Sequence, residues 1–147
     1  MCGFIMLNPS TADAEIDDPT IRACGQFARR WGLDGFVVAN LWPLRATDPA
    51  DLKAAGVEER CGPVEADLAK IFSPIERYQR FIVAWGAQPV PGIGERIHEV
   101  KTFARSFGRK LYCLGRCADG SPRHPLYVKR STRMKVWFDP AEGTTRP

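Results

Sequence analysis

Four short apolar runs constrain the fold of this 147-residue chain more than any other feature. They are residues 3–7, 36–39, 81–85 and 111–114, and none of them contains a charged residue. Runs of this length are typical of strands that are buried on both faces of a sheet. Stretches with helical periodicity separate the runs. The alternation predicts an α/β fold of three layers, α/β/α, around a four-stranded and mostly parallel sheet with right-handed crossovers.

The first helix is the most clearly marked. Apolar residues recur at three- and four-residue spacing from Ile21 to Trp31, Asp18 is placed to cap the helix, and Pro19 suits its first position. We also predict a short helix from Asp48 through Leu52, a longer one over 63–73 and another over 97–107. One domain should span residues 1–140, with 141–147 as a disordered tail.

Composition indicates a soluble globular protein, with 44% hydrophobic and 26% charged residues. No apolar run approaches the roughly 20 residues that span a bilayer, and the first residues show no basic region ahead of a long apolar run. We therefore expect a cytoplasmic protein without a membrane partner. Five cysteines, an odd number, argue against a disulfide framework.

Polar residues follow each predicted strand. Asn8 and Asn40 end the first two strands, Trp85 and Gly86 end the third, and His124 lies in the loop after the fourth. In an open α/β sheet, ligands bind beyond the carboxyl ends of the strands. An asparagine amide can pair with the edge of a nucleobase, and a histidine can donate a hydrogen bond to a ligand oxygen that gains charge. Trp85 can either stack on a ligand or fill the core.

The loop after the first strand is polar and acidic. Ser10 and Thr11 are candidate ligand contacts there, and Asp13 is a candidate general base beside Asn8. All three residue types also cap helices well, so a capping turn is the alternative. Arg45, in the loop after the second strand, is a candidate phosphate contact through its planar guanidinium.

A metal or thiol site is a weaker alternative. Cys113 and Cys117 precede His124, but the other cysteines show no paired spacing, and structural metal sites generally need four well-spaced ligands. Gly92 and Gly94 lack the third glycine of a dinucleotide fingerprint, and no Walker-type loop is present. We expect neither a metal nor another cofactor.

Taken together, the motifs resemble a bacterial and phage family catalogued as domain of unknown function 1643. The resemblance rests on the segments 7–13, 18–22, 40–41 with 45–49, 84–86 and 123–127, the last of which contributes Arg123, His124 and Tyr127. Members of that family usually have residues ahead of the first strand. We therefore expect that an edge strand or hairpin is missing before Met1. The first strand would then be an exposed edge that could pair with a second chain, so a homodimer is an open alternative.

A more remote similarity is to the uracil-DNA glycosylase superfamily. It implies that Asn8 positions a water molecule, that Asn40 reads the edge of the base, and that His124 stabilises the departing base. The reaction implied is hydrolysis of the N-glycosidic bond of a flipped nucleotide, without a metal. Leu126 and Tyr127 depart from the small, serine-containing end of that family's last motif. Phe27 is the nearest candidate for a stacking aromatic, although its place on the helix stripe favours the core.

The alternative from another class is a non-catalytic module that binds nucleic acid or a modified base. It would use the basic segment from Arg123 to Lys135, where five lysine and arginine residues fall within thirteen positions. Salt dependence separates the two hypotheses, because phosphate-driven binding weakens steeply as salt is added. The net charge of +4 is compatible with either.

Overall fold

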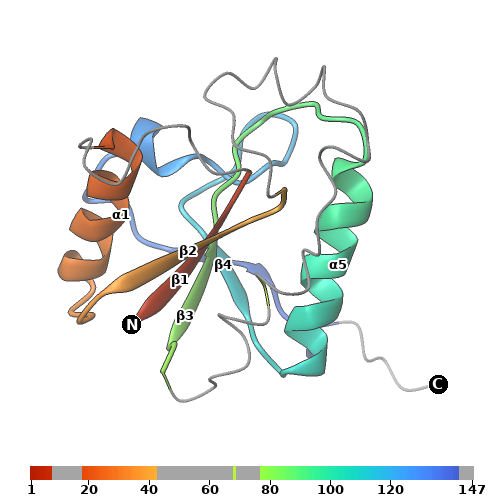
Figure 1. The fold of residues 1–147 in the computed structure, drawn as a ribbon, viewed down its shortest axis with the longest axis horizontal. Coiled ribbons are helices and arrows are strands. Elements are labelled where there is room, and N and C mark those ends of the chain that lie inside the picture. The colour runs from red at the N-terminus through yellow and green to blue at the C-terminus, as the bar shows by residue number, and fades with distance from the viewer. Residues whose placement is uncertain (8–17, 43–67, 69–76, 143–147) are drawn as a thin grey trace.

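The computed structural model describes residues 1–7, 18–42, 68 and 77–142 (Figure 1). Their elements, in chain order, are β1 (Cys2–Met6), α1 (Pro19–Arg30), β2 (Phe36–Asn40), β3 (Arg80–Val83), α5 (Ile93–Ser106), β4 (Leu111–Cys113), the 3-10 helix η1 (Pro125–Tyr127) and β5 (Lys135–Phe138). The four predicted strands and the helices predicted near 19–31 and 97–107 are confirmed. The helix predicted over 48–52 lies outside the described residues. Of the helix predicted over 63–73, only Leu68 is described, and it is helical and buried.

The sheet has five strands rather than four, in the order β2-β1-β3-β4-β5. β1 pairs in parallel with both β2 and β3, and β3 pairs in parallel with β4, whereas β5 runs antiparallel to β4. The sheet is therefore mixed. β5 escapes prediction because its apolar run, 136–138, has only three residues and follows the charged Lys135, so it is shorter than each of the four predicted runs.

The expectation that the first strand lies at an exposed edge is wrong. β1 has a hydrogen-bonded neighbour on each side, and among the described strands the edges belong to β2 and β5. This position explains the sequence of β1, all of whose five residues are buried. A strand covered on both faces and both sides has no exposed position at which a charge would be tolerated.

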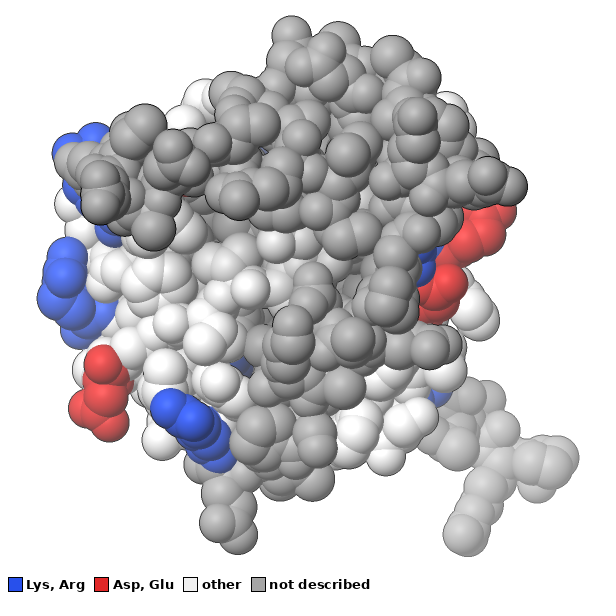
Figure 2. All heavy atoms as spheres, in the orientation of Figure 1, with Lys and Arg blue, Asp and Glu red and all other residues white. Residues whose placement is uncertain are grey.

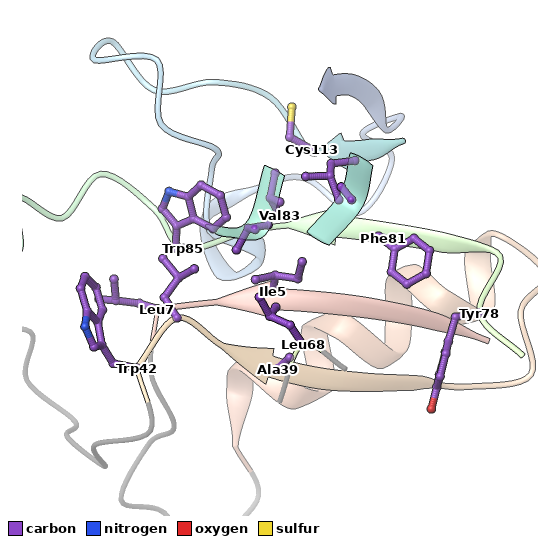
Figure 3. Packing of buried hydrophobic residues seen from close by; sticks show 14 of the residues in the cluster. Ile5, Leu7, Ala39, Trp42, Leu68, Tyr78, Phe81, Val83, Trp85 and Cys113 are labelled. Carbon is purple, nitrogen blue, oxygen red and sulfur yellow. The ribbon is translucent and has the colours of Figure 1, made fainter. Parts of the chain in front are cut away.

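Alternate residues of β1 supply two cores, one on each face of the sheet. Phe4 and Met6 pack with Cys24 and Phe27 of α1. Ile5 and Leu7 face the opposite way, in a cluster that includes residues of α5 (Figure 3). The two described helices thus cover opposite faces, as Figure 1 shows, which confirms the three-layer arrangement. No helix within the described residues is long and apolar enough to cross a membrane.

Helix α1 begins as its sequence predicts. The carboxylate of Asp18 accepts hydrogen bonds from the backbone N–H groups of Thr20 and Ile21, at 2.7 and 3.4 Å, and Pro19 takes the first position. The outer side of the helix is polar and basic: Arg22, Arg29 and Arg30 are exposed there. Figure 2 shows basic side chains at the surface on this side of the molecule.

Arg130 attaches the segment around η1 to α1. Its guanidinium donates to the side-chain oxygen of Gln26 at 2.6 Å and to the backbone oxygens of Pro125 and Val128 at 2.9 and 2.8 Å. It also lies over the ring of Phe27, 5.2 Å from the ring centroid. One cationic side chain therefore joins two parts of the chain that are 104 residues apart in sequence.

Replacing Arg130 with alanine should lower the free energy of unfolding by about 2–3 kcal/mol, because the hydrogen bonds of a charged donor to Gln26 and to two backbone oxygens are lost. Arg130→Lys should recover only part of this loss, since one ammonium cannot reproduce the planar fork. Chemical denaturation measures both. Arg133→Ala, an exposed arginine in the same segment, is the control and should change stability by less than about 0.5 kcal/mol. Equal effects of the two alanine variants would contradict the attachment.

Candidate functional site

The carboxyl ends of β1, β2 and β3 meet at one edge of the sheet. Beyond β2, the N–H groups of Leu41 and Trp42 donate to the backbone oxygens of Met6 and Leu7, at 2.8 and 3.0 Å. The N–H of Gly86, just after β3, donates to the oxygen of Pro122 at 2.9 Å. This last bond brings the loop that follows β4 to the end of β3. The same edge receives the N-terminus of α1, because a right-handed crossover returns the helix antiparallel to its strands.

Contacts with Gly86 and with the backbone of Leu126 position His124 at this edge. Gly86 has a φ of +76°, and a Cβ at that position would lie 3.6 Å from the Cβ of His124. The imidazole Nδ1 accepts the backbone N–H of Leu126 at 3.2 Å, and Pro125 then opens η1. Because Nδ1 acts as an acceptor, the proton of the neutral ring resides on Nε2. His124 therefore presents an N–H donor on its outer nitrogen.

The surroundings of His124 favour the neutral ring. Burial lowers the pKa of His124 below its usual value of 6.5, and the charge of Asp18 at the start of α1 opposes that shift. A histidine with a depressed pKa is uncharged at neutral pH. The group can then donate a hydrogen bond through Nε2 without carrying a positive charge of its own.

Asn40 is the last residue of β2 and is partly buried. It pairs in register with Met6 of β1. Ala39 packs in the cluster on the α5 side, so the alternation of side chains along the strand directs Asn40 to the α1 side. Its amide makes no hydrogen bond to any residue within the described ranges. The structure thus assigns Asn40 to the face on which α1 and η1 pack against each other.

Trp85 does not join this group. Its side chain is 2% exposed and belongs to the cluster on the α5 side, where Figure 3 shows it beside Leu7 and Trp42. Its ring packs edge-to-face with Trp137, with centroids 5.2 Å apart. Of the two roles that the sequence leaves open for Trp85, the structure supports the core role. Its indole N–H is buried and has no hydrogen-bond partner among the described residues.

The exposed aromatic ring at this edge belongs to Tyr127. It is 79% exposed, and its centroid lies 5.7 Å from that of His124. Phe27, the stacking candidate suggested by its sequence position, is fully buried in the core. The exposure of a residue cannot be read from a sequence. The sequence signal for Tyr127 is its place as a large aromatic residue in a loop, directly after His124-Pro125-Leu126.

Arg123 is also exposed, and its Nε donates to the backbone oxygen of Arg116 at 3.2 Å. That bond orders the loop after β4 while the rest of the guanidinium stays at the surface. Five further predicted site residues lie outside the described residues, namely Asn8, Ser10, Thr11, Asp13 and Arg45. Of the predicted polar residues, Asn40 and His124 therefore lie at the same edge of the sheet, while the acidic loop stays a prediction.

Two of the four described cysteines are buried thiols with raised pKa values. Burial raises the pKa of Cys2 to about 11 and that of Cys24 to about 12, so both thiols are protonated at neutral pH. Cys113 is buried in β4 and Cys117 is half-buried in the following loop. Across the part of the chain that the structure describes, no three His, Cys, Asp or Glu side chains are grouped to hold a metal ion.

A family model described as "Protein of unknown function (DUF1643)" matches residues 1–126. The chain therefore belongs to this family, and the resemblance found in its motifs is confirmed. The match covers β1 through most of η1. No curated protein and no solved structure matches the chain.

The burial of His124 should make stability depend on pH. The unfolded chain takes up a proton near pH 6.5, whereas folded His124 does so only at lower pH, so the free energy of unfolding falls as the pH drops through this window. Urea denaturation at pH 7.5 and 5.0 should show a larger loss for the wild type than for His124→Gln. His98→Gln, which changes the other histidine of the chain, should behave like the wild type. A loss that is unaltered in His124→Gln would contradict the burial of a neutral ring.

Proposed function

We propose that this DUF1643 protein binds a nucleobase at the carboxyl edge of its sheet and hydrolyses the N-glycosidic bond that joins the base to its sugar. One observation carries the proposal. The Nδ1 atom of His124 accepts the N–H of Leu126, and burial keeps the ring neutral, so Nε2–H is a fixed donor at a strand end. Such a donor suits a carbonyl oxygen on which negative charge develops.

In the proposed reaction, the bond between the base nitrogen and C1′ of the sugar breaks, and its electron pair leaves with the base. The Nε2–H of His124 donates a hydrogen bond to the oxygen of the base as that charge grows. Water adds to C1′ and passes its proton to Asp13, while Asn8 holds the water in position. Every atom is accounted for: the water oxygen stays on the sugar, and the base takes up a proton after it leaves.

Recognition of the base is proposed for Asn40. It lies on the α1 side of the sheet, and its amide offers an acceptor and two donors of the kind that pair with a base edge. The exposed ring of Tyr127, beside His124, supplies an apolar surface at the rim of the same site. Ser10, Thr11, Arg45 and Arg123 are proposed contacts to the sugar and phosphate.

A second candidate is recognition of a base without hydrolysis. The observation in its favour is the excess of basic residues after α5 begins: between positions 96 and 135 the sequence has eleven lysine and arginine residues against two acidic ones. A binding module would form a saturable complex but release no free base. The two candidates therefore differ in product, whatever their affinities.

The test is a base-release assay on nucleosides, nucleotides and oligonucleotides that contain uracil or damaged bases, read by chromatography of the free base. We expect release from at least one substrate. His124→Ala should lower the rate of release about 100- to 1000-fold, as is usual when one donor to a developing anion is removed. Asn40→Ala should reduce discrimination between bases.

His98→Ala is the matched control, because it removes an exposed histidine from α5 and should leave the rate within about twofold of the wild type. Binding without release would favour the second candidate. Absence of both binding and release for every substrate would refute the base site itself. An unchanged rate in His124→Ala would remove His124 from the mechanism.

A further inference from the structure

A group of cations lies over aromatic rings on the surface between α5 and β5. The Nζ of Lys101 is 5.0 Å from the ring centroid of Trp137, and the guanidinium carbon of Arg116 is 5.8 Å from the same centroid. The guanidinium carbon of Arg105 is 5.0 Å from the centroid of Phe138. Three elements contribute to this group: α5, the loop after β4, and β5.

Lys135 extends the same surface. It is the exposed first residue of β5 and lies two positions before Trp137, so the two side chains leave the strand on the same face. We call the set of Lys101, Arg105, Arg116 and Lys135 the cationic surface. Arg105, Arg116 and Lys135 are exposed, and Lys101 is half-buried where its stem crosses the aromatic rings.

The charges of the cationic surface are not neutralised by neighbouring carboxylates within the described residues. Three described acids from the same part of the chain have other partners: Glu99 pairs with Arg96, Asp139 pairs with Lys110, and Asp119 accepts from the backbone and hydroxyl of Ser121. A cluster of uncompensated cations creates a positive potential that attracts polyanions.

The cations are also held in place before any ligand arrives. Besides its position over Trp137, Arg116 donates to the backbone oxygens of Gly120 and Trp137, at 3.3 and 3.0 Å. Lys101 lies over both Trp137 and Phe138, 5.7 Å from the centroid of the second ring. Side chains that are already ordered lose less conformational entropy on binding. The rings therefore act as a support that orients the charges.

We propose that the cationic surface binds the phosphate backbone of duplex nucleic acid without reading its sequence. Charge complementarity selects a polyanion. The rings favour a duplex over a single strand. Surfaces that bind single strands offer open rings on which bases stack, whereas Trp137 and Phe138 are half-buried and covered by cations. This binding is separate from the base chemistry at the carboxyl edge and does not require it.

The cationic surface differs from the basic segment, Arg123 to Lys135, that the sequence suggests as a binding site for nucleic acid. Arg130 of that segment is engaged with Gln26 and two backbone carbonyls, and Arg123 donates to the backbone of Arg116. Of the segment from Arg123 to Lys135, only Lys135 belongs to the cationic surface as defined. The remaining members come from α5 and from the loop after β4.

The test is fluorescence anisotropy with a labelled 20-base-pair DNA duplex of arbitrary sequence, titrated with the full chain at several salt concentrations between 50 and 200 mM. The variant is the double substitution Lys101→Gln with Arg105→Gln, both on α5. The control is Arg29→Gln with Arg30→Gln, which removes the same charge from exposed positions at the end of α1. Thermal unfolding of each variant checks that it is folded.

We expect the wild type to bind the duplex with an affinity that falls steeply as salt rises. The α5 variant should bind at least about tenfold more weakly, and the slope of log affinity against log salt should shrink by about two, one for each phosphate contact removed. The α1 control should keep the wild-type affinity within about threefold. His124→Ala should bind the duplex normally, which separates this surface from the base site.

Four results would overturn the proposal: no binding of the wild type at 50 mM salt, equal losses in the two double variants, tighter binding of a single strand than of the duplex, or binding to vesicles rich in phosphatidylserine in place of DNA. The third result would indicate base stacking, and the fourth a lipid surface. If Lys101→Gln with Arg105→Gln unfolds, Lys135→Gln alone should lower the salt slope by about one.

Discussion

The structure depends on the burial of β1 in the middle of the sheet. With β2 on one side and β3 on the other, β1 makes parallel ladders along both of its edges, and its alternate side chains enter both cores. Parallel pairing of consecutive strands requires a crossover between them. The crossover sets α1 on one face and starts it at the carboxyl edge, so a single packing constraint places Asp18 and Asn40 at the same edge of the sheet. The loop after β4 brings His124 to that edge as well.

That constraint divides the strand-end residues between two faces. Asn40 pairs with Met6 and leaves β2 on the α1 side, whereas Trp85 follows Val83, which pairs with Ile5, and therefore points to the α5 side. The carboxyl edge near α1 carries polar chemistry and an exposed Tyr127. The α5 side carries Trp85 packed against Trp137, with Lys101 and Arg116 over the ring of Trp137. The two proposed binding surfaces therefore lie on different parts of the molecule.

Much of this arrangement follows from local sequence. Charge-free runs predict β1 to β4, and Asp18-Pro19 predicts where α1 begins, because each signal depends on a few neighbouring residues. β5 has a weaker signal, since its apolar run is only three residues long and begins after the charged Lys135. β5 also carries Trp137, which packs against Trp85 and lies under the ammonium group of Lys101.

The candidate site was predictable as a location and only partly as a set of side chains. Strand order places Asn40 and His124 at one edge, but the face that each residue takes depends on the register between strands, which no local pattern encodes. The role of Arg130 depends on Gln26, 104 residues away, so a basic segment that looks available in the sequence is partly used within the fold. The neutrality of His124 is likewise a consequence of tertiary burial.

The most direct test of the central claim is a titration of the isotope-labelled protein with nucleoside 5′-monophosphates, followed by the amide resonances in two-dimensional ¹H–¹⁵N NMR. We expect saturable chemical-shift changes at Gly86, Asn40 and the residues around His124, with little change along α5. Shifts confined to α5 and β5 would indicate that only phosphate is bound, and no shift at the carboxyl edge with any of the nucleotides would contradict a base site there.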